Sequence, residues 1–355
     1  MKSKPGAKIY IIIVNYINYM DTIECLESVF RNNYLNYQVI VVDNHSPNNS
    51  LEYLKAWAEG RFNPELKQNL ALKSLSSPPV KKPIEYVVYT QELAERGGDK
   101  DLKKPFNNSI IFVHADHNRG FAFGNNIGIK YALAKDDFEA VILLNPDTVI
   151  STDAISKLCY AYENNKDALF TGRILYYKNP DVIWYDGGSF NEWLATTRHL
   201  NIDKKSLIGT ENPTKVSFMT FCFVLIPKKV ISKIGVLDES YFMYTEDLEY
   251  SYRAKKSGFH LYHVPGSVIW HKAGSGSRRN VSPLFAYYYY KNGLKFRCTK
   301  LKGVKQIISL FYYFIRLPYS FTKWLISNPK IGKIMLRAVA DQLHEMFSCE
   351  PRVIF

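Results

Sequence analysis

Four short apolar runs, separated by segments with helical spacing, dominate the first 150 residues. The runs cover residues 9–14, 38–42, 110–114 and 140–144. Apolar runs that alternate with helical segments are typical of βαβ units, in which helices connect the parallel strands of one sheet. The pattern therefore predicts an α/β fold whose first half is a Rossmann-like parallel sheet.

The segments between these runs predict the connecting helices. Asp21 and Glu24 have the spacing of a capping box, and they precede the apolar positions Ile23, Leu26 and Phe30. Residues 48–58 and 124–134 are also expected to be helical. Residues 60–108 break the alternation with five prolines and a Gly-Gly pair, so we expect an insertion that contains one strand near residues 84–89.

The second half of the sequence has a more mixed pattern of expected helices and strands. We expect a helix over residues 152–164, strands near 169–174 and 216–226, and a helix that starts near Thr245. Two further strands are expected at 260–264 and 268–271. From about Ser282 the chain is helical in pattern, aromatic and basic. This divides the chain into residues 1–280, with the 60–108 insertion, and a helical extension over 281–355.

The charge balance points to anionic partners. The 46 Lys and Arg exceed the 33 Asp and Glu by 13, which favours nucleic acid, anionic lipid or diphosphate ligands, unless the charge serves only solubility. No nucleic-acid-binding motif occurs, so we do not expect a nucleic-acid partner. Five scattered cysteines without a CxxC pair indicate a reducing compartment.

The sequence also bears on membranes. No signal peptide is evident at the N-terminus, and the long apolar stretch at 306–326 is interrupted by Arg316, Pro318 and Lys323, which makes it a poor membrane span. We therefore expect a cytoplasmic protein that is soluble or peripheral. The basic and aromatic extension suits a helix lying on an anionic membrane surface, and equally suits a helical lid that packs on the main domain.

Polar residues follow three of the expected strands. They are Asn15-Tyr16, Asp43 and Asn145-Pro146-Asp147. In open α/β sheets, ligands bind at the carboxyl ends of the strands. A carboxylate at Asp43 could accept hydrogen bonds from a base or ribose, and one at Asp147 could hold a divalent cation against a diphosphate. Any one of these residues could instead cap the following helix, but three together favour a ligand site.

The segment from His117 to Asn126 joins a strand to a helix and is rich in glycine. Gly120, Gly124 and Gly128 would let the backbone approach a neighbour closely, and amides at a helix start can face phosphate. The segment matches neither GxGxxG nor a Walker motif. A structural turn followed by close helix packing explains it nearly as well, and a dinucleotide-dependent oxidoreductase is disfavoured.

Two acids stand together in the second half. Glu246 and Asp247 follow an aromatic cluster and begin a predicted helix, with Thr245 as a candidate cap. The helix dipole there would keep a carboxylate ionised, as a general base must be, although acids are common at helix starts. His271 ends a strand just before Gly274-Ser275-Gly276. A lone histidine is more often structural, and we leave the other histidines with that interpretation.

Six segments in order carry a family resemblance. They read VNYINYMDTIECLESV, VVDNHSPN, HNRGFAFGNNIGI, LLNPDTVI, FMYTEDLEYSYRAKKSGF and VIWHKAGSGS. Together they resemble family 2 glycosyltransferases over roughly residues 8–275 apart from the insertion. The branch they most resemble contains rhamnosyltransferase-like and galactofuranosyltransferase-like enzymes that build bacterial surface polysaccharides. The fold this implies is a GT-A type domain with a mixed, mostly parallel sheet.

The resemblance also implies a role for each matching residue. The nucleobase pocket would be lined by Val14, Tyr16 and Asp43, and the nucleotide or donor sugar would lie near Gly120, Asn126 and Asn145. A Mg²⁺ or Mn²⁺ ion would bind to Asp147 and His271. Asp247 would be the catalytic base, and Glu246 would face the acceptor. One departure is Asn145, which stands where the family's metal motif has its first acid. Asparagine there lowers the negative charge of the site.

The function that the resemblance implies is inverting transfer of a sugar from a nucleotide-diphosphate donor to a lipid-linked or polysaccharide acceptor. The donor expected from the branch is dTDP-rhamnose, with a UDP-hexose or UDP-galactofuranose as alternatives. The enzyme would work at the inner face of the cell membrane. A different class, a non-catalytic protein that binds carbohydrate or an anionic polymer, is disfavoured because Asp147 and Asp247 are both present.

Overall fold

One twisted sheet runs through the centre of the computed structural model, which describes residues 6–66, 68–99, 109–206, 212–273 and 281–348. Within these ranges the main path of the sheet has the order β11-β13-β7-β12-β5-β1-β2-β4-β3, with β6 and β8 paired at its side. The order reverses around β1, because β2 lies on one side of it and β5 on the other. Ligands of open α/β sheets bind at such reversal points.

The first half of the sheet is parallel, and its strands are buried on both faces apart from the edge strand β3. Its strands are β1 (Ile9–Asn15), β2 (Tyr37–Asp43), β3 (Tyr86–Thr90), β4 (Ile110–His114) and β5 (Ala140–Leu144). Alternate residues of β1 belong to two separate cores, with Ile11 facing one and Ile12 the other. Because both faces are buried, these strands are apolar at nearly every position, which is the pattern that the sequence shows.

The second half is mixed. Its strands are β6 (Thr148–Ile150), β7 (Ala168–Tyr176), β8 (Ile183–Tyr185), β11 (Thr214–Lys215), β12 (Phe223–Pro227) and β13 (His260–His271), with a separate hairpin of β9 (Gly188–Asn191) and β10 (Thr196–His199). β12 runs antiparallel to β5, and β13 runs parallel to β7 with a bulge between Val264 and Val268. The predicted α/β class with a mixed, mostly parallel sheet is confirmed.

Helices cover both faces of the sheet. One face packs against α1 (Tyr19–Val29), α2 (Ser50–Ala58) and α5 (Ala154–Asn164), and the other against α4 (Phe121–Lys135), α6 (Lys228–Ile234) and α7 (Glu246–Lys256). The insertion contributes β3, a single 3₁₀ turn (Lys73–Leu75) and the short α3 (Gln91–Glu95).

Two glycines set the distance between α4 and β1. A Cβ atom on Gly124 would lie 2.6 Å from Val14 Cγ1, and one on Gly128 would lie 2.7 Å from Ile12 Cγ2. Both distances are shorter than carbon atoms tolerate, so only glycine allows the helix to pack this closely. Close packing, rather than phosphate contact, therefore explains these two positions.

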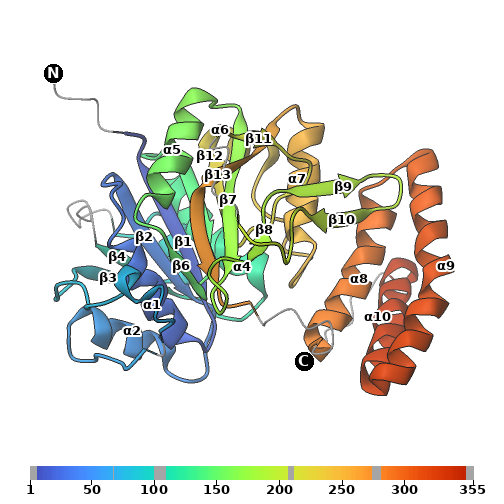
Figure 1. The fold of residues 1–355 in the computed structure, drawn as a ribbon, viewed down its shortest axis with the longest axis horizontal. Helices are drawn as coiled ribbons and strands as arrows, with labels where there is room; N and C mark the ends of the chain where they lie inside the picture. The colour runs from blue at the N-terminus through green and yellow to red at the C-terminus, as the bar shows by residue number, and fades with distance from the viewer. Residues whose placement is uncertain (1–5, 67, 100–108, 207–211, 274–280, 349–355) are drawn as a thin grey trace.

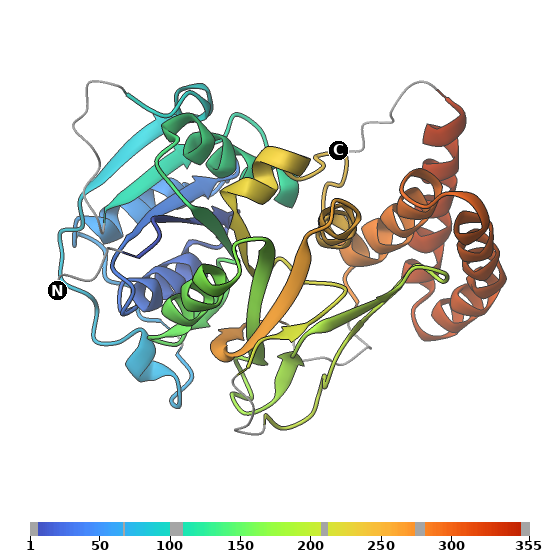
Figure 2. The same cartoon turned by 90° about the horizontal axis from the view of Figure 1, so that it is seen from above.

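Three helices follow the sheet and form a bundle at one end of the molecule (Figures 1 and 2). They are α8 (Pro283–Thr299), α9 (Gly303–Ser327) and α10 (Pro329–Phe347). Ser282 and Asn328 cap α8 and α10, since their side chains accept hydrogen bonds from Phe285 N and Ile331 N, and a proline opens each helix. None of the described helices is both long and apolar enough to cross a bilayer.

Some local predictions are wrong in instructive ways. Asp21 and Glu24 form no capping box, because α1 already begins at Tyr19 and the buried Glu24 instead accepts a hydrogen bond from Tyr177 and pairs with Lys272. The strand expected over 216–226 begins only at Phe223. The two strands expected at 260–264 and 268–271 are one bulged strand, β13.

The packing of α4 on β1 generates the first prediction. Gly128→Ala should lower the free energy of unfolding by about 1–3 kcal/mol, because the added methyl group overpacks the contact with Ile12. The matched control is Gly293→Ala in α8, where the nearest atom to a new Cβ is Arg297 Nη1 at 3.4 Å. The control should be neutral or stabilising by up to about 1 kcal/mol, since alanine favours helix. Denaturant unfolding measures both, and equal effects would contradict the assignment.

Candidate active site

The carboxyl ends of β1 and β2 bring Asn15 and Asp43 together. The two residues are direct neighbours in the parallel register, and Asn15 Nδ2 donates to Asp43 Oδ1 at 2.7 Å. Asp43 Oδ2 accepts from the backbone N of Ser46 at 3.1 Å. Two donors thus orient the buried carboxylate, and it retains acceptor capacity for a ligand. Tyr16 beside it is 43% exposed.

Three exposed histidines lie at the sheet edge that carries Asp43, although the sequence pattern favoured a structural role for them. His114 Nδ1 lies 3.6 Å from Asp43 Oδ2. The ring centroid of His45 lies 5.8 Å from that of His114 and 6.0 Å from that of His117. They come from the ends of β2 and β4 and the loop after β4. Their shared place at one sheet edge depends on the strand order, which no local motif reveals.

A short antiparallel pairing of two strands far apart in the sequence brings Asp147 and His271 together. β6 pairs antiparallel with the end of β13, so that His271 stands opposite Thr148. The imidazole Nε2 lies 3.2 Å from Asp147 Oδ2, and the ring packs edge-on against Trp184 at 4.8 Å between centroids. The two residues predicted to bind a metal are therefore direct neighbours. The Gly274-Ser275-Gly276 loop lies outside the described residues.

The side chains of Asp147 and His271 each stabilise the charged form of the other. Burial lowers the pKa of His271, but the Asp147 carboxylate and then Cys222 raise it more, so the pKa lies well above its usual value. Burial raises the pKa of Asp147, but His271 and then Lys272 outweigh burial, so this pKa is lowered. Asp147 is therefore an anion at neutral pH.

The donor atoms here fit a divalent cation. Asp147 offers a partly exposed carboxylate, His271 an imidazole that would release its proton on binding a metal, and the buried Oδ1 of Asn145 has no hydrogen-bond partner among the described residues. Oxygen and imidazole donors suit Mg²⁺ or Mn²⁺. In the described ranges no group of three or more His, Cys, Asp or Glu side chains could hold a metal. Such an ion would need further oxygens from a ligand.

Gly120 fixes the loop after β4 against the loop before α7. Its φ is +92°, and a Cβ atom would lie 1.8 Å from the carbonyl oxygen of Phe242, which accepts from Phe121 N at 2.8 Å. Only glycine fits both the left-handed conformation and this contact. Gly120 therefore joins the glycine-rich segment to the segment that carries the two acids.

Two consecutive left-handed residues precede those acids. Tyr244 has φ +64° and Thr245 φ +79°, an uncommon conformation for residues other than glycine, and one that collects at functional sites. Asn292 of α8 holds the turn, since its Nδ2 donates to the carbonyl oxygens of Met243 and Tyr244, each at 2.9 Å. Thr245 stands at the N-cap position but its side chain makes no capping bond.

Burial, not the helix dipole, has the larger effect on the pKa values of Glu246 and Asp247. Burial raises the pKa of Asp247 to about 7, although the backbone N of Leu248 donates to its carboxylate at 2.7 Å and acts in the opposite direction. Burial and then the neighbouring Asp247 raise the pKa of Glu246 well above its usual value. The expectation that the dipole keeps these acids fully ionised is wrong, because the cost of removing a charge from water is larger.

The pKa of Tyr244 responds to carboxylates from both parts of the candidate site, Asp147 and Glu246. Burial, then the carboxylates of Glu246 and Asp147, raise the pKa of Tyr244, so its phenol lies within electrostatic reach of both acids. A hydrogen bond from Met219 N to Ser251 Oγ of α7 and one from Asn145 N to Cys222 O join the helix that carries Asp247 to the segment beside Asp147, 100 residues away in the sequence.

Asn126 lies deeper than the resemblance implied. It is fully buried, its Nδ2 donates to Leu237 O and Glu239 Oε1, and its Oδ1 accepts from Leu237 N. These bonds tie α4 to the loop that leads to α7. The contact of Asn126 with a donor sugar stays a prediction.

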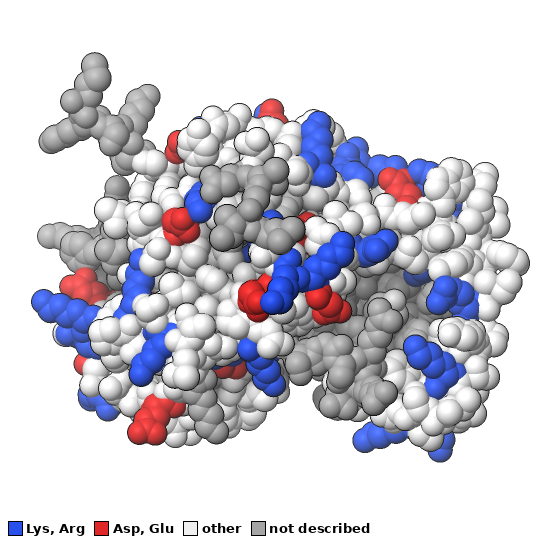
Figure 3. Space-filling model, viewed as in Figure 1, with Lys and Arg blue, Asp and Glu red and all other residues white. Residues whose placement is uncertain are grey.

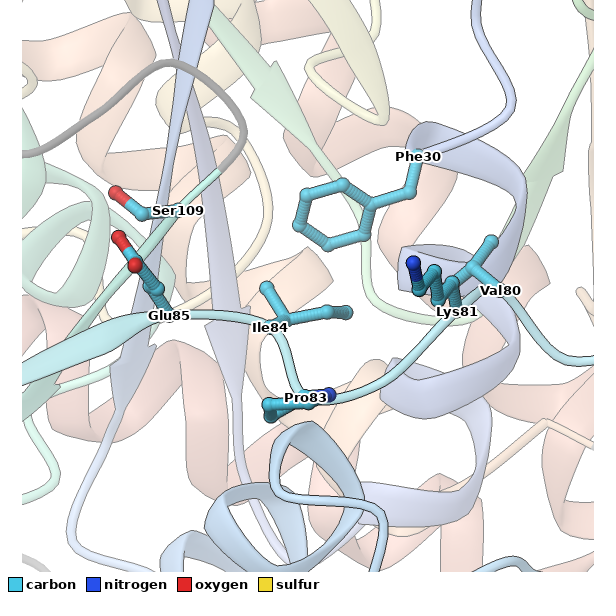
Figure 4. Close-up of a pocket in the computed structure, with 7 residues that line it drawn as sticks. All are labelled: Phe30, Val80, Lys81, Pro83, Ile84, Glu85 and Ser109. Carbon is cyan, nitrogen blue, oxygen red and sulfur yellow. The ribbon is translucent and has the colours of Figure 1, made fainter.

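Of two cavities in the described part of the chain, one lies away from the candidate site and the other lies next to it. The cavity of ≈ 330 Å³ in Figure 4 lies at the amino ends of β3 and β4, near Glu85 and Ser109, which is the edge away from the strand-end polar residues. A larger cavity of ≈ 590 Å³ opens between the start of α1, the insertion and Lys272, whose backbone N donates to Asp147 O. The larger one therefore adjoins the candidate site.

Two protein-family models match this chain. The model described as "Glycosyltransferase like family 2" matches residues 87–288, more than half of the chain, and the model "Glycosyl transferase family 2" matches residues 10–69. The chain belongs to glycosyltransferase family 2. Both matched stretches contain parts of the site, Asp43 in one and Asp147, Asp247 and His271 in the other.

Curated members of family 2 that resemble the chain include a low-salt glycan biosynthesis hexosyltransferase, Agl10, of Haloferax volcanii. It is 30% identical over 153 residues, which are 43% of this chain and 48% of Agl10. The dTDP-rhamnosyl transferase RfbF of Shigella flexneri is 25% identical over 52% of this chain and 61% of its own length. The matched regions thus span about half to three fifths of these relatives.

Solved structures share the fold. The mannosyltransferase PcManGT of Pyrobaculum calidifontis, in complex with GDP-Man and Mn²⁺, aligns with a TM-score of 0.53 at 9% identity, over 97% of this chain and 91% of its own. GalNAc-T7 with UDP, GalNAc and Mn²⁺ aligns at 0.52 and 13% identity, over 90% of this chain and 58% of its own. The family 2 chain therefore has the GT-A fold, followed by C-terminal helices.

The raised pKa of Asp247 generates a stability prediction. With a folded-state pKa near 7 and an ordinary value of 3.8, the folded protein loses stability as pH rises from about 4 through 7, because the unfolded chain ionises this group more easily. Asp247→Asn removes that loss. The variant should match the wild type near pH 4 and exceed its free energy of unfolding by on the order of 1–3 kcal/mol at pH 8.

Denaturant unfolding across this pH range measures the difference. Asp181→Asn is the control, because Asp181 is 65% exposed and faces Lys205 at 3.7 Å. A gain at Asp247 that does not change with pH would show that burial leaves this carboxyl group unshifted.

Proposed function

We propose that this family 2 protein is an inverting glycosyltransferase that moves a sugar from a nucleotide-diphosphate donor to a hydroxyl group of a lipid-linked or polysaccharide acceptor. The observations that carry this proposal are the contact of Asp147 with His271 at 3.2 Å and the hydrogen bonds that join residues 219–222 to both Asn145 and α7. The cation site, the buried Glu246 and the half-buried Asp247 would then share one site, as a single-displacement transfer requires. Residues 1–280 would form the catalytic domain, with 60–108 inserted, and 281–355 its extension.

The donor would bind along the carboxyl edge of the sheet. Val14, Tyr16 and Asp43 would receive the nucleobase, with Asp43 accepting hydrogen bonds through its free lone pairs, and Gly120, Asn126 and Asn145 would lie toward the donor sugar. A divalent cation, Mg²⁺ or Mn²⁺, held by Asp147 and His271 would supply positive charge that stabilises the diphosphate. The solved relatives with Mn²⁺ and a nucleotide or nucleotide sugar support this placement.

Asp247 would act as the base. A pKa of about 7 lets it accept a proton near neutral pH. As it takes the proton from the acceptor hydroxyl, that oxygen bonds to the anomeric carbon. The bond from this carbon to the diphosphate oxygen breaks, and its electron pair leaves with the nucleoside diphosphate, so the configuration inverts. Glu246 keeps its proton and can donate a hydrogen bond to the acceptor.

The donor that we propose is dTDP-rhamnose. The resemblance to the Shigella dTDP-rhamnosyl transferase and to rhamnosyltransferase WbbL of Escherichia coli, 24% identical over 48% of this chain and 67% of WbbL, supports it. The hexosyltransferase Agl10 favours a UDP-hexose as the second candidate. We place the reaction at the inner face of the cell membrane, where a lipid-linked acceptor would be found.

Replacing the base tests the mechanism. Asp247→Asn should lower turnover by about 10²–10⁴-fold, the usual contribution of a general base, and should leave the affinity for nucleoside diphosphate within about twofold. Turnover is measured as release of nucleoside diphosphate from each sugar nucleotide of a panel, with Asp181→Asn as the control. Near wild-type turnover by Asp247→Asn would remove Asp247 from the mechanism.

Replacing the metal ligand tests the cation site independently of turnover. Calorimetric titration with thymidine and uridine diphosphates should show that Mn²⁺ strengthens binding to the wild type and that chelation reverses this. Asp147→Ala should lose the Mn²⁺ effect. Asn145→Asp should strengthen Mn²⁺ binding by roughly tenfold, because ligand charge tunes the affinity of such sites. If Mn²⁺ has the same effect on all three proteins, the cation does not bind at these residues.

A further inference from the structure

The exposed face of α9 is apolar along its whole length. Side chains exposed by 42% to 85% follow one another at helical spacing, and they include Ile307, Phe311, Phe314, Ile315, Tyr319 and Ile326. At 3.6 residues per turn they form one stripe, about 35 Å long for a helix of this length. A soluble helix normally buries such a stripe, but α9 packs its other side on α8 and α10. In Figure 1, α9 stands at the outer edge of the bundle, away from the sheet.

Cations flank the stripe; one of them, Lys305, pairs with Glu192 at 2.5 Å, while Arg316 and Lys323 are exposed. The charged residues of α9 are Lys305, Arg316 and Lys323, 11 and 7 residues apart. These spacings are close to whole numbers of turns, so the three side chains share one flank of the stripe. Lys330, Lys333 and Arg337 form a second exposed basic row on α10, at spacings of three and four.

The bundle as a whole is strongly basic. Residues 283–348 contain 11 Lys and Arg but only two acids, Asp341 and Glu345, a balance of +9 out of the +13 of the chain. Neither acid faces the stripe. Asp341 accepts a hydrogen bond from Tyr287 at 2.8 Å, and Glu345 pairs with Lys291 at 2.6 Å. Figure 3 shows Lys and Arg side chains among uncharged atoms over this lobe.

We propose that the apolar stripe of α9 docks the protein on an anionic lipid surface, with the stripe in the boundary between headgroups and acyl chains and the basic rows against the headgroups. An amphipathic helix with apolar and cationic sides binds such surfaces. A second copy of this chain is a poorer occupant, because a symmetric contact through the stripe would bring the same cationic flanks together. This inference deepens the proposed function, since it names the surface that would bring the site to a lipid-linked acceptor.

The bundle connects this surface to the site. α8 packs against α9 and α10 on one side. On its other side Asn292 holds the carbonyl oxygens of Met243 and Tyr244, and Tyr288 stacks on Phe242 with 5.0 Å between centroids. Docking through α9 would therefore set the position of Asp247 relative to the lipid surface through the contacts of α8.

Flotation of the full chain with vesicles tests the proposal without requiring turnover. The wild type should float with vesicles of phosphatidylglycerol and phosphatidylcholine, less with phosphatidylcholine alone, and less at high salt. Arg316→Glu with Lys323→Glu should lower binding to the anionic vesicles by at least about 25-fold, because each cation near such a surface contributes roughly fivefold.

A second variant tests the stripe, and a third serves as its control. Phe311→Glu with Ile315→Glu should abolish flotation, whereas Leu70→Glu with Tyr160→Glu, at residues that are 88% and 73% exposed elsewhere, should not. Circular dichroism and donor hydrolysis in the absence of lipid should be unchanged in all variants, so a failure of the proposed function is seen separately. Wild-type flotation by the stripe variant would overturn the proposal. So would a lack of flotation by the wild type combined with stripe-dependent dimers in light scattering.

Discussion

The turn before α7 is the constraint on which the site depends. Two residues without glycine's freedom, Tyr244 and Thr245, both adopt left-handed conformations, at a cost of order 1–3 kcal/mol each. The amide of Asn292 offsets this by donating to two successive carbonyl oxygens, and Gly120 closes on Phe242 from the other side. These contacts hold the turn from which α7 and its two acids, Glu246 and Asp247, begin.

The carboxyl groups of the site have pKa values that are shifted in opposite directions. Asp147 is held charged because His271 and Lys272 outweigh its burial, whereas burial raises the pKa of Asp247 and Glu246 with no cation to oppose it. One sheet edge thus offers an anion for a cation and, close by, Asp247, a group that exchanges its proton near neutral pH. Separating pKa values by environment is how one site performs two roles.

The sequence predicted what depends on local pattern, and missed what depends on strand order. Apolar runs located β1, β2, β4 and β5 because both faces of a parallel sheet are buried, and the ordered motifs gave the GT-A fold. Asp43 and Asp147 were singled out because they follow strands, whereas a metal-binding role for His271 came only from the family resemblance. The histidines around Asp43, the role of Asn292 and the raised pKa of Asp247 were missed. Each of these depends on neighbours far away in the sequence, and on how deeply a helix start is buried, which the helix dipole argument ignored.

The C-terminal helices belong to the catalytic unit in a physical sense. α8 supplies the amide that holds the strained turn, and the ring of Tyr288 that stacks on Phe242, so removing the bundle would release the segment that carries Asp247. The same three helices leave one apolar face uncovered on their far side. A chain that needed α8 only as a brace would gain nothing from an exposed row that includes Phe311 and Ile315, which favours aggregation in water. The uncovered face is therefore best explained by a partner surface outside the chain, and the cations beside it select an anionic one.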